Sequence, residues 1–138
     1  MLPEDYLQDV ASFAHSRGVS LHLDGARIFN AAIASGTTVS QLARFSDSIQ
    51  VCLSKGLSAP VGSLVIGDTK LVCRVRELRK ILGGTMRQAG IIAAPGIVAL
   101  KTMGDRLEED HLNPSFTRGF ARRWNIRSNS DGRQTNCQ

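Results

Sequence analysis

The sequence predicts an α/β domain with a mostly parallel sheet and flanking helices. Short apolar runs that end in charged residues alternate with stretches of helical periodicity, which is the pattern of βαβ units. Hydrophobic residues make up 42% of the 138 residues and charged residues 21%, as in ordinary globular proteins. This length suits one domain with a real hydrophobic core.

The first part of the chain alternates helical and strand patterns. Apolar residues at helical spacing follow two acidic residues near the N-terminus, and Gly18 and Gly36 stand where helices are expected to end. The predicted elements are a helix at 3–17, a strand at 19–23, a helix at 27–35, a short capped helical turn at 38–43 and a strand at 48–53.

The second part adds one strand and several helices. A tight connection after Leu53 predicts that a strand at 64–66 runs antiparallel to its predecessor. The segment 87–103 is apolar almost all round, which predicts a buried or interface helix. The remaining predicted elements are a helix at 69–80 with one apolar face, a charged helix at 104–111, and a tail at 112–138 predicted to be disordered and separate from the domain at 1–111.

Charge and cysteine content exclude several classes of protein. The net charge of +5 belongs largely to residues 112–138, which carry five arginines and one aspartate, so a nucleic-acid-binding module is the least favoured function. No apolar run approaches the roughly 18 residues of a membrane span, and the acidic N-terminus is unlike a signal peptide. Three widely spaced cysteines indicate neither a disulfide scaffold nor a metal site. We therefore expect a cytoplasmic protein, with a mitochondrial location left open.

Two charged residues at predicted strand ends carry the candidate chemistry. Lys55 follows an apolar strand and precedes a turn rich in Gly, Ser and Pro, where α/β folds commonly bind ligands. Asp24 ends the preceding strand. An enzyme that uses pyridoxal phosphate needs such a pair, because a lysine binds the cofactor aldehyde and an acid keeps the ring nitrogen protonated. Each residue also has a plainer interpretation when it is taken alone. Lys55 would then be a surface lysine in a loop, and Asp24 would be the N-cap of the following helix.

Three motifs together resemble the low-specificity L-threonine aldolases, which are pyridoxal-phosphate enzymes of the aspartate-aminotransferase-like fold (fold type I). The motifs are His22-Leu23-Asp24-Gly25-Ala26-Arg27, Ser54-Lys55-Gly56-Leu57 with Ala59-Pro60-Val61-Gly62-Ser63, and Gly83-Gly84-Thr85-Met86-Arg87-Gln88-Ala89-Gly90. The resemblance covers residues 2–111 and implies a partial large domain of this fold, without the N-terminal part and the C-terminal small domain.

The resemblance assigns roles to four residues. It implies that Lys55 is the catalytic lysine that binds pyridoxal 5'-phosphate, and that Asp24 pairs with the ring nitrogen. Arg27 would contact the cofactor region and the substrate carboxylate, although a surface ion pair is its plain alternative. Arg87 would reach the cofactor phosphate of a neighbouring subunit, so a homo-oligomer is expected. Weaker candidates are Lys80 and Ser54, and a packing role is expected for His22 and a surface position for His15 and His111.

The implied reaction cleaves L-threonine or L-allo-threonine to glycine and acetaldehyde through a Schiff base on Lys55. The phosphate-binding loop, the stacking histidine and the histidine base of the family lie upstream of this chain, and the distal carboxylate-binding arginine lies beyond His111. We therefore expect little activity from the chain alone. Two alternatives stay open, namely a catalytically inactive truncated isoform that associates with full-length subunits, and another pyridoxal-phosphate lyase or transferase.

Overall fold

The computed structural model describes the backbone of residues 3–123 and the side chains of residues 3–109. The chain divides into two compact units, at residues 1–107 and 108–138. The first unit holds the sheet and the helices around it, which confirms the predicted α/β class. In the second unit the described backbone, through Arg123, is helical.

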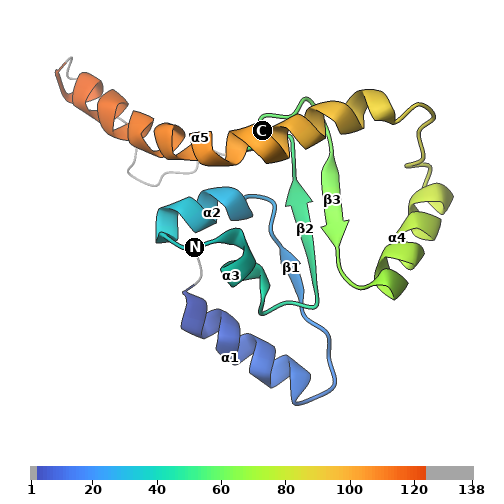
Figure 1. Cartoon of the computed structure of the whole chain (residues 1–138). Coiled ribbons are helices and arrows are strands. Elements are labelled where there is room, and N and C mark those ends of the chain that lie inside the picture. The colour runs from blue at the N-terminus through green and yellow to red at the C-terminus, as the bar shows by residue number, and fades with distance from the viewer. Residues whose placement is uncertain (1–2, 124–138) are drawn as a thin grey trace, which may run out of the picture. The chain divides into compact units, whose positions relative to one another are not determined.

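The elements follow the predicted order along the chain (Figure 1). They are α1 (Glu4–His15), β1 (His22–Asp24), α2 (Ile28–Ser35), α3 (Val39–Ala43), β2 (Ser48–Cys52), β3 (Ser63–Ile66), α4 (Thr69–Ile81) and α5 (Gly90–Arg123).

The three strands form one mixed sheet in the order β1-β2-β3. Strand β1 pairs with β2 in parallel, and Asp24 lies opposite Gln50 in that register. Strand β3 pairs with β2 in antiparallel orientation, with Cys52 opposite Ser63. Both strand directions agree with the sequence-based predictions. Figure 1 shows α1 to α3 on the β1 side of the sheet and α4 beyond β3.

Local sequence explains where α2 ends and α3 begins. Gly36 closes α2 in the left-handed conformation, with φ of 64°, which costs glycine little. Thr38 then caps α3 in a capping box, in which its hydroxyl accepts from the N–H of Gln41 and the Gln41 side chain accepts from the N–H of Thr38. These two signals confirm the predicted helical turn at 38–43.

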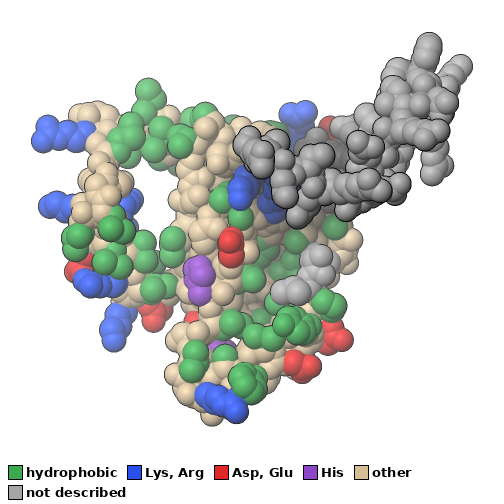
Figure 2. All heavy atoms as spheres, turned by 180° about the vertical axis from the view of Figure 1, so that it is seen from behind, with side chains coloured by type: hydrophobic (Ala, Val, Ile, Leu, Met, Phe, Trp, Pro, Cys, Tyr) green, Lys and Arg blue, Asp and Glu red, His purple; other side chains and the backbone are tan. Residues whose placement is uncertain are grey.

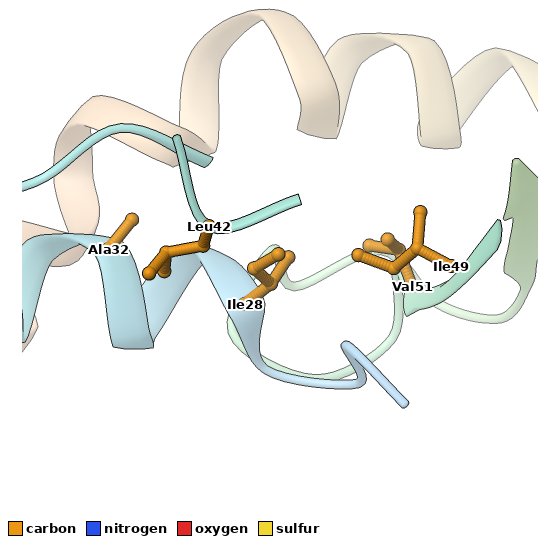
Figure 3. Close-up of a cluster of buried hydrophobic side chains, with 5 residues drawn as sticks. All are labelled: Ile28, Ala32, Leu42, Ile49 and Val51. Atoms are coloured by element: carbon orange, nitrogen blue, oxygen red, sulfur yellow. The ribbon is translucent and has the colours of Figure 1, made fainter. Parts of the chain in front are cut away.

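The first cluster of buried side chains joins α2 and α3 to β2 (Figure 3). Ile49 and Val51 alternate with more exposed residues along β2, so one face of the strand supplies the core. They point toward side chains from the two helices, namely Ile28, Ala32 and Leu42. This packing fixes α2 against the strand that leads to Lys55.

The second cluster lies under the segment that follows β2. Leu57 is 1% exposed, and it packs with side chains of the same segment and of α5. The buried members are Leu53, Leu57, Ala59, Ala99 and Leu107. The segment after β2 is therefore held by a core of its own.

The boundaries of two elements differ from the predictions. Strand β1 begins at His22, and just before it the N–H of Leu21 donates to the carboxylate of Asp47, at 2.7 Å, while the carbonyl of Leu21 accepts from the backbone N–H of Asp47 at 2.9 Å. Helix α5 begins at Gly90 because Gln88, with φ of 48°, interrupts the helical backbone after Arg87. The described backbone of the predicted tail is helical as far as Arg123. Residues 124–138 lie outside the described residues, so the predicted disorder of the tail at 112–138 stays a prediction.

Helix α4 and the start of α5 carry hydrophobic side chains at the surface. Figure 2 shows them there among lysine and arginine side chains. Ile91 is 74% exposed and Val98 is 58% exposed, so the apolar segment 87–103 is only partly buried in this chain. Within residues 3–123, no helix is both long enough and apolar enough to cross a membrane.

Candidate functional site

The topology brings the predicted acid and the predicted amine to one edge of the sheet. Strand β1 ends at Asp24, and its parallel neighbour β2 ends at Cys52, three residues before Lys55. Neighbouring parallel strands present their carboxyl ends at the same edge, which is where ligands bind in open α/β sheets. Both side chains are exposed there.

The turn after Asp24 is held tightly against β2. The Asp24 carboxylate accepts from the N–H of Ala26 at 3.1 Å, which forms an Asx turn. The N–H of Gly25 donates to the carbonyl of Gln50 at 2.8 Å. A Cβ atom on Gly25 would lie 2.7 Å from the Ile49 side chain, so only glycine allows this approach. The backbone around Asp24 is thus fixed to the neighbouring strand.

We call residues 53–62 the lysine loop. Its backbone folds on itself, because the N–H of Ala59 donates to the carbonyl of Leu53 and the N–H of Ser58 donates to the carbonyl of Lys55, both at 3.0 Å. The buried Leu57 anchors the loop from below. Lys55 therefore projects an exposed side chain from a rigid base.

Arg27 shares a hollow with Asp24. It directly precedes α2, and its carbonyl accepts from the N–H of Ala31 at 3.0 Å. The hollow has a volume of about 260 Å³, and Lys55 is not among its lining residues. Apart from Asp24 and Arg27, its lining consists of Leu7, Leu23, Gly25, Ile28, Ala31 and Leu42. Arg27 and Asp24 therefore line the same hollow, apart from Lys55.

Arg87 lies apart from this group. We call residues 82–89, between α4 and α5, the arginine turn; Arg87 is exposed within it. Lys80, in the last turn of α4, is also exposed. Neither residue lines the hollow beside Asp24. A role for Arg87 in a neighbouring subunit remains a prediction.

The lesser candidates have ordinary surroundings. Ser54 is exposed in the lysine loop. His22 is exposed on β1, where its Nδ1 lies 2.9 Å from the hydroxyl of Ser48, so the expected packing inside the strand is wrong. His15 lies at the surface, as expected, with Nε2 2.9 Å from the Asp47 carboxylate. His111 lies outside the side chains that the structure describes.

Sequence reasoning gave no role to Gln50 and Cys52, in the last residues of the strand that leads to Lys55. The Gln50 amide donates to the Cys52 sulfur at 3.2 Å and the Ser63 hydroxyl donates to it at 3.6 Å. These two hydrogen bonds, and after them the charge of Lys55, lower the pKa of the Cys52 thiol. The available signal was period-two alternation in β2, which places Gln50 and Cys52 on one face.

Comparison with known proteins gives the family. Residues 1–131 match the family model for beta-eliminating lyases. The chain belongs to the beta-eliminating lyase family. The match extends beyond residue 111, where the sequence analysis placed a domain boundary that remains a prediction.

Several relatives of this chain are threonine aldolases. The low specificity L-threonine aldolase of Escherichia coli O157:H7 is 48% identical over 116 residues, covering 84% of this chain and 35% of the relative. The low-specificity L-threonine aldolase 1 of Arabidopsis thaliana is 43% identical over 136 residues, covering 98% of this chain and 38% of the relative. The chain thus spans about a third of the length of these lyases.

Solved structures share the fold. A protein of Exiguobacterium sp. 255-15, described as an aromatic amino acid beta-eliminating lyase/threonine aldolase, matches with a TM-score of 0.74 and 24% identity, over 79% of this chain and 31% of that one. A protein of Listeria monocytogenes EGD-E, described as an L-allo-threonine aldolase, matches with a TM-score of 0.73 and 22% identity over the same shares. The α/β unit is therefore part of the fold of this lyase family.

The donor set fits two ends of pyridoxal phosphate, the cofactor of this family. Lys55 supplies a primary amine for the aldehyde, and Asp24 supplies a carboxylate for a protonated ring nitrogen. Gly25 lets the backbone beside Asp24 approach β2 closely. Of the phosphate contacts, the described residues offer only the separate Arg87 as a candidate.

Proposed function

We propose that this chain is the part of an L-threonine aldolase that carries the catalytic lysine and the acid at the cofactor ring. The carrying observation is the parallel pairing of β1 with β2, which puts Asp24 and Lys55 at one sheet edge. The 48% identity to a low specificity L-threonine aldolase supports the choice of reaction within the family. The complete protein would cleave L-threonine or L-allo-threonine to glycine and acetaldehyde.

Lys55 and Asp24 would hold different parts of the cofactor. Pyridoxal phosphate, when bound, supplies an aldehyde for covalent attachment and an aromatic ring that withdraws electrons. Lys55 offers its amine from the rigid base of the lysine loop. Asp24, fixed by the Gly25–Gln50 hydrogen bond, keeps a proton on the ring nitrogen by its negative charge. The two residues together orient the ring between two strand ends.

Arg27 suits the carboxylate of the amino-acid substrate. Its guanidinium is planar and permanently charged, so it binds a carboxylate through two parallel hydrogen bonds. That Arg27 and Asp24 line one hollow supports binding of the substrate's charged end next to the ring. We infer from this geometry that loss of Arg27 weakens amino-acid binding more than cofactor binding.

The test is an absorbance spectrum of the purified chain with pyridoxal phosphate, with and without Lys55→Arg. This variant keeps the positive charge but removes the reactive amine. We expect an absorbance band near the edge of the visible range that depends on Lys55. Lys70→Arg, at an exposed lysine of α4, is the matched control and should leave the band unchanged.

The two measurements test different claims, namely the role of Lys55 and the activity of the chain alone. A band that survives in Lys55→Arg would refute the role of Lys55. Acetaldehyde release from L-threonine is the second measurement, and we expect little from the chain alone because it spans about a third of its relatives. Rapid turnover by the purified chain would overturn this second expectation.

The exposed apolar face favours a second candidate function, as a partner of longer subunits. Ile91, Ile97 and Val98 of α5 are each more than half exposed, which is unusual for a face that stays in water. An inactive chain would then pair with full-length subunits through this face. Co-purification with a full-length aldolase, lost on Ile91→Asp, would support this role over the catalytic one.

A further inference from the structure

Asn30 lies against the lysine loop at the residue next to Lys55. Its Oδ1 is buried and, among the residues described, is without a hydrogen-bond partner. A Cβ atom built on Gly56 would overlap this oxygen and would lie 3.0 Å from Asn30 Cγ. The side-chain amide therefore occupies the space that any larger residue at position 56 would need.

This contact joins the two halves of the candidate site. Asn30 belongs to α2, the helix that follows the turn of Asp24, and Gly56 directly follows Lys55. Helix α2 is fixed to the sheet by the buried Ile28 and Ala32. The spacing between the acid's turn and the amine's loop thus depends on how closely Gly56 approaches Asn30.

Gly56 is needed for space and not for backbone conformation. Its φ is not among the positive values of the described residues, one of which is the φ of 120° at Gly62. The buried Leu57 holds the loop from below, so the loop cannot simply swing away from α2. A side chain at position 56 must therefore displace either Asn30 or the backbone beside Lys55.

We propose that Asn30 is a positioning residue for Lys55, acting through Gly56. The amide sets the distance between α2 and the lysine loop, and the chain keeps an unpaired buried oxygen at this point for that spacing. Buried amides normally find a partner, so an oxygen without one calls for an explanation, and its position against Gly56 offers one. The inference rests on the proposed function, which gives Lys55 its reaction.

The experiment measures where pyridoxal phosphate becomes fixed on the whole chain. Sodium borohydride fixes it on amines, and mass spectrometry then compares Lys55 with Lys70 and Lys101. Hydrogen exchange at the amides of Ser58 and Ala59 reports the order of the loop without any cofactor. The variants are Gly56→Ala, Asn30→Ala and the double variant.

We expect Gly56→Ala to lower fixation on Lys55 about tenfold or more, since an ångström of misplacement is enough for such a loss. Exchange at Ser58 and Ala59 should rise with it. The double variant Asn30→Ala/Gly56→Ala makes room for the new methyl group and should recover most of both signals. Gly90→Ala is the matched control, because a Cβ atom there would meet nothing within 4 Å.

Each result decides the proposal. Unchanged fixation in Gly56→Ala, or no recovery in the double variant, would overturn it. If Gly56→Ala does not fold, Asn30→Gln presses on the loop from the other side and should give the same loss. No selectivity for Lys55 in the wild type would refute the proposed function, while the exchange rates of the single and double variants would still decide the Asn30–Gly56 contact.

Discussion

The lysine loop and the arginine turn are both glycine-containing connections that carry a basic residue, yet they pack differently. The lysine loop follows a strand and rests on Leu57, which is 1% exposed. The arginine turn lies between two helices, and its first residue, Leu82, is 81% exposed. The backbone beside Lys55 is therefore supported by a buried side chain of its own loop, whereas the residues of the arginine turn are all exposed.

The largest effect is expected when one side chain in each of the two segments is shortened to alanine. Leu57→Ala removes a buried side chain and should lower the free energy of unfolding by about 2–5 kcal/mol. Met86→Ala, in the arginine turn, removes a 53% exposed side chain and should change it by less than about 0.5 kcal/mol. Urea denaturation of both variants measures the difference, and equal losses would contradict the comparison.

The second test concerns what covers the arginine turn. If another copy of the chain does, Ile91→Asp should weaken self-association by about 1.5–3 kcal/mol, the value of burying one such side chain. Sedimentation over a range of protein concentrations measures this, with Lys101→Asp on the same helix as the control. A wild-type chain that stays monomeric throughout would show that another copy does not cover this segment.

A smaller, pH-dependent effect is expected at the other end of β2. The N–H of Leu21, and then His15, bind the Asp47 carboxylate and lower its pKa. A lowered pKa of an acid adds stability above its unfolded value, near 3.9, and the gain disappears as pH falls through the folded value. Asp47→Asn should therefore melt below the wild type at pH 6, and the two melting temperatures should converge below about pH 4.

The smallest effect concerns the thiol beside the lysine loop. The pKa of Cys52 is lowered, first by the hydrogen bond from Gln50, so the thiolate forms at lower pH than in a free cysteine. Gln50→Leu should shift the midpoint of the alkylation rate of Cys52 upward in pH. Site-resolved mass spectrometry after brief iodoacetamide treatment measures this, and an unchanged midpoint would show that the hydrogen bond has little influence.

Much of the fold could be predicted from local signals in the sequence. Gly36 and the Thr38–Gln41 capping box mark helix ends by chemistry that acts within a few residues. The contact just before β1 could not be predicted, because it is a bond between Leu21 and Asp47, which are far apart in sequence. Long-range contacts of this kind leave no periodic signal.

Some residues of the candidate site could likewise be predicted from the sequence, and others could not. Asp24 and Lys55 were predicted because each ends an apolar run, and parallel pairing then brings them to one edge. Asn30 was missed because it is an ordinary polar residue in a helix, and only the folded chain shows its amide against Gly56. Roles that depend on the shape of a contact are visible only in three dimensions.

The position of β1 at the border of the sheet has a consequence for the acid. Strand β1 pairs only with β2 among the strands described, so its other side offers unpaired backbone groups to any segment that extends the sheet. A strand added there would exclude water from the last residue of β1, which is Asp24. In drier surroundings its negative charge would attract a cationic ring nitrogen more strongly. The strand that completes the sheet would then also strengthen the attraction between Asp24 and the ring nitrogen.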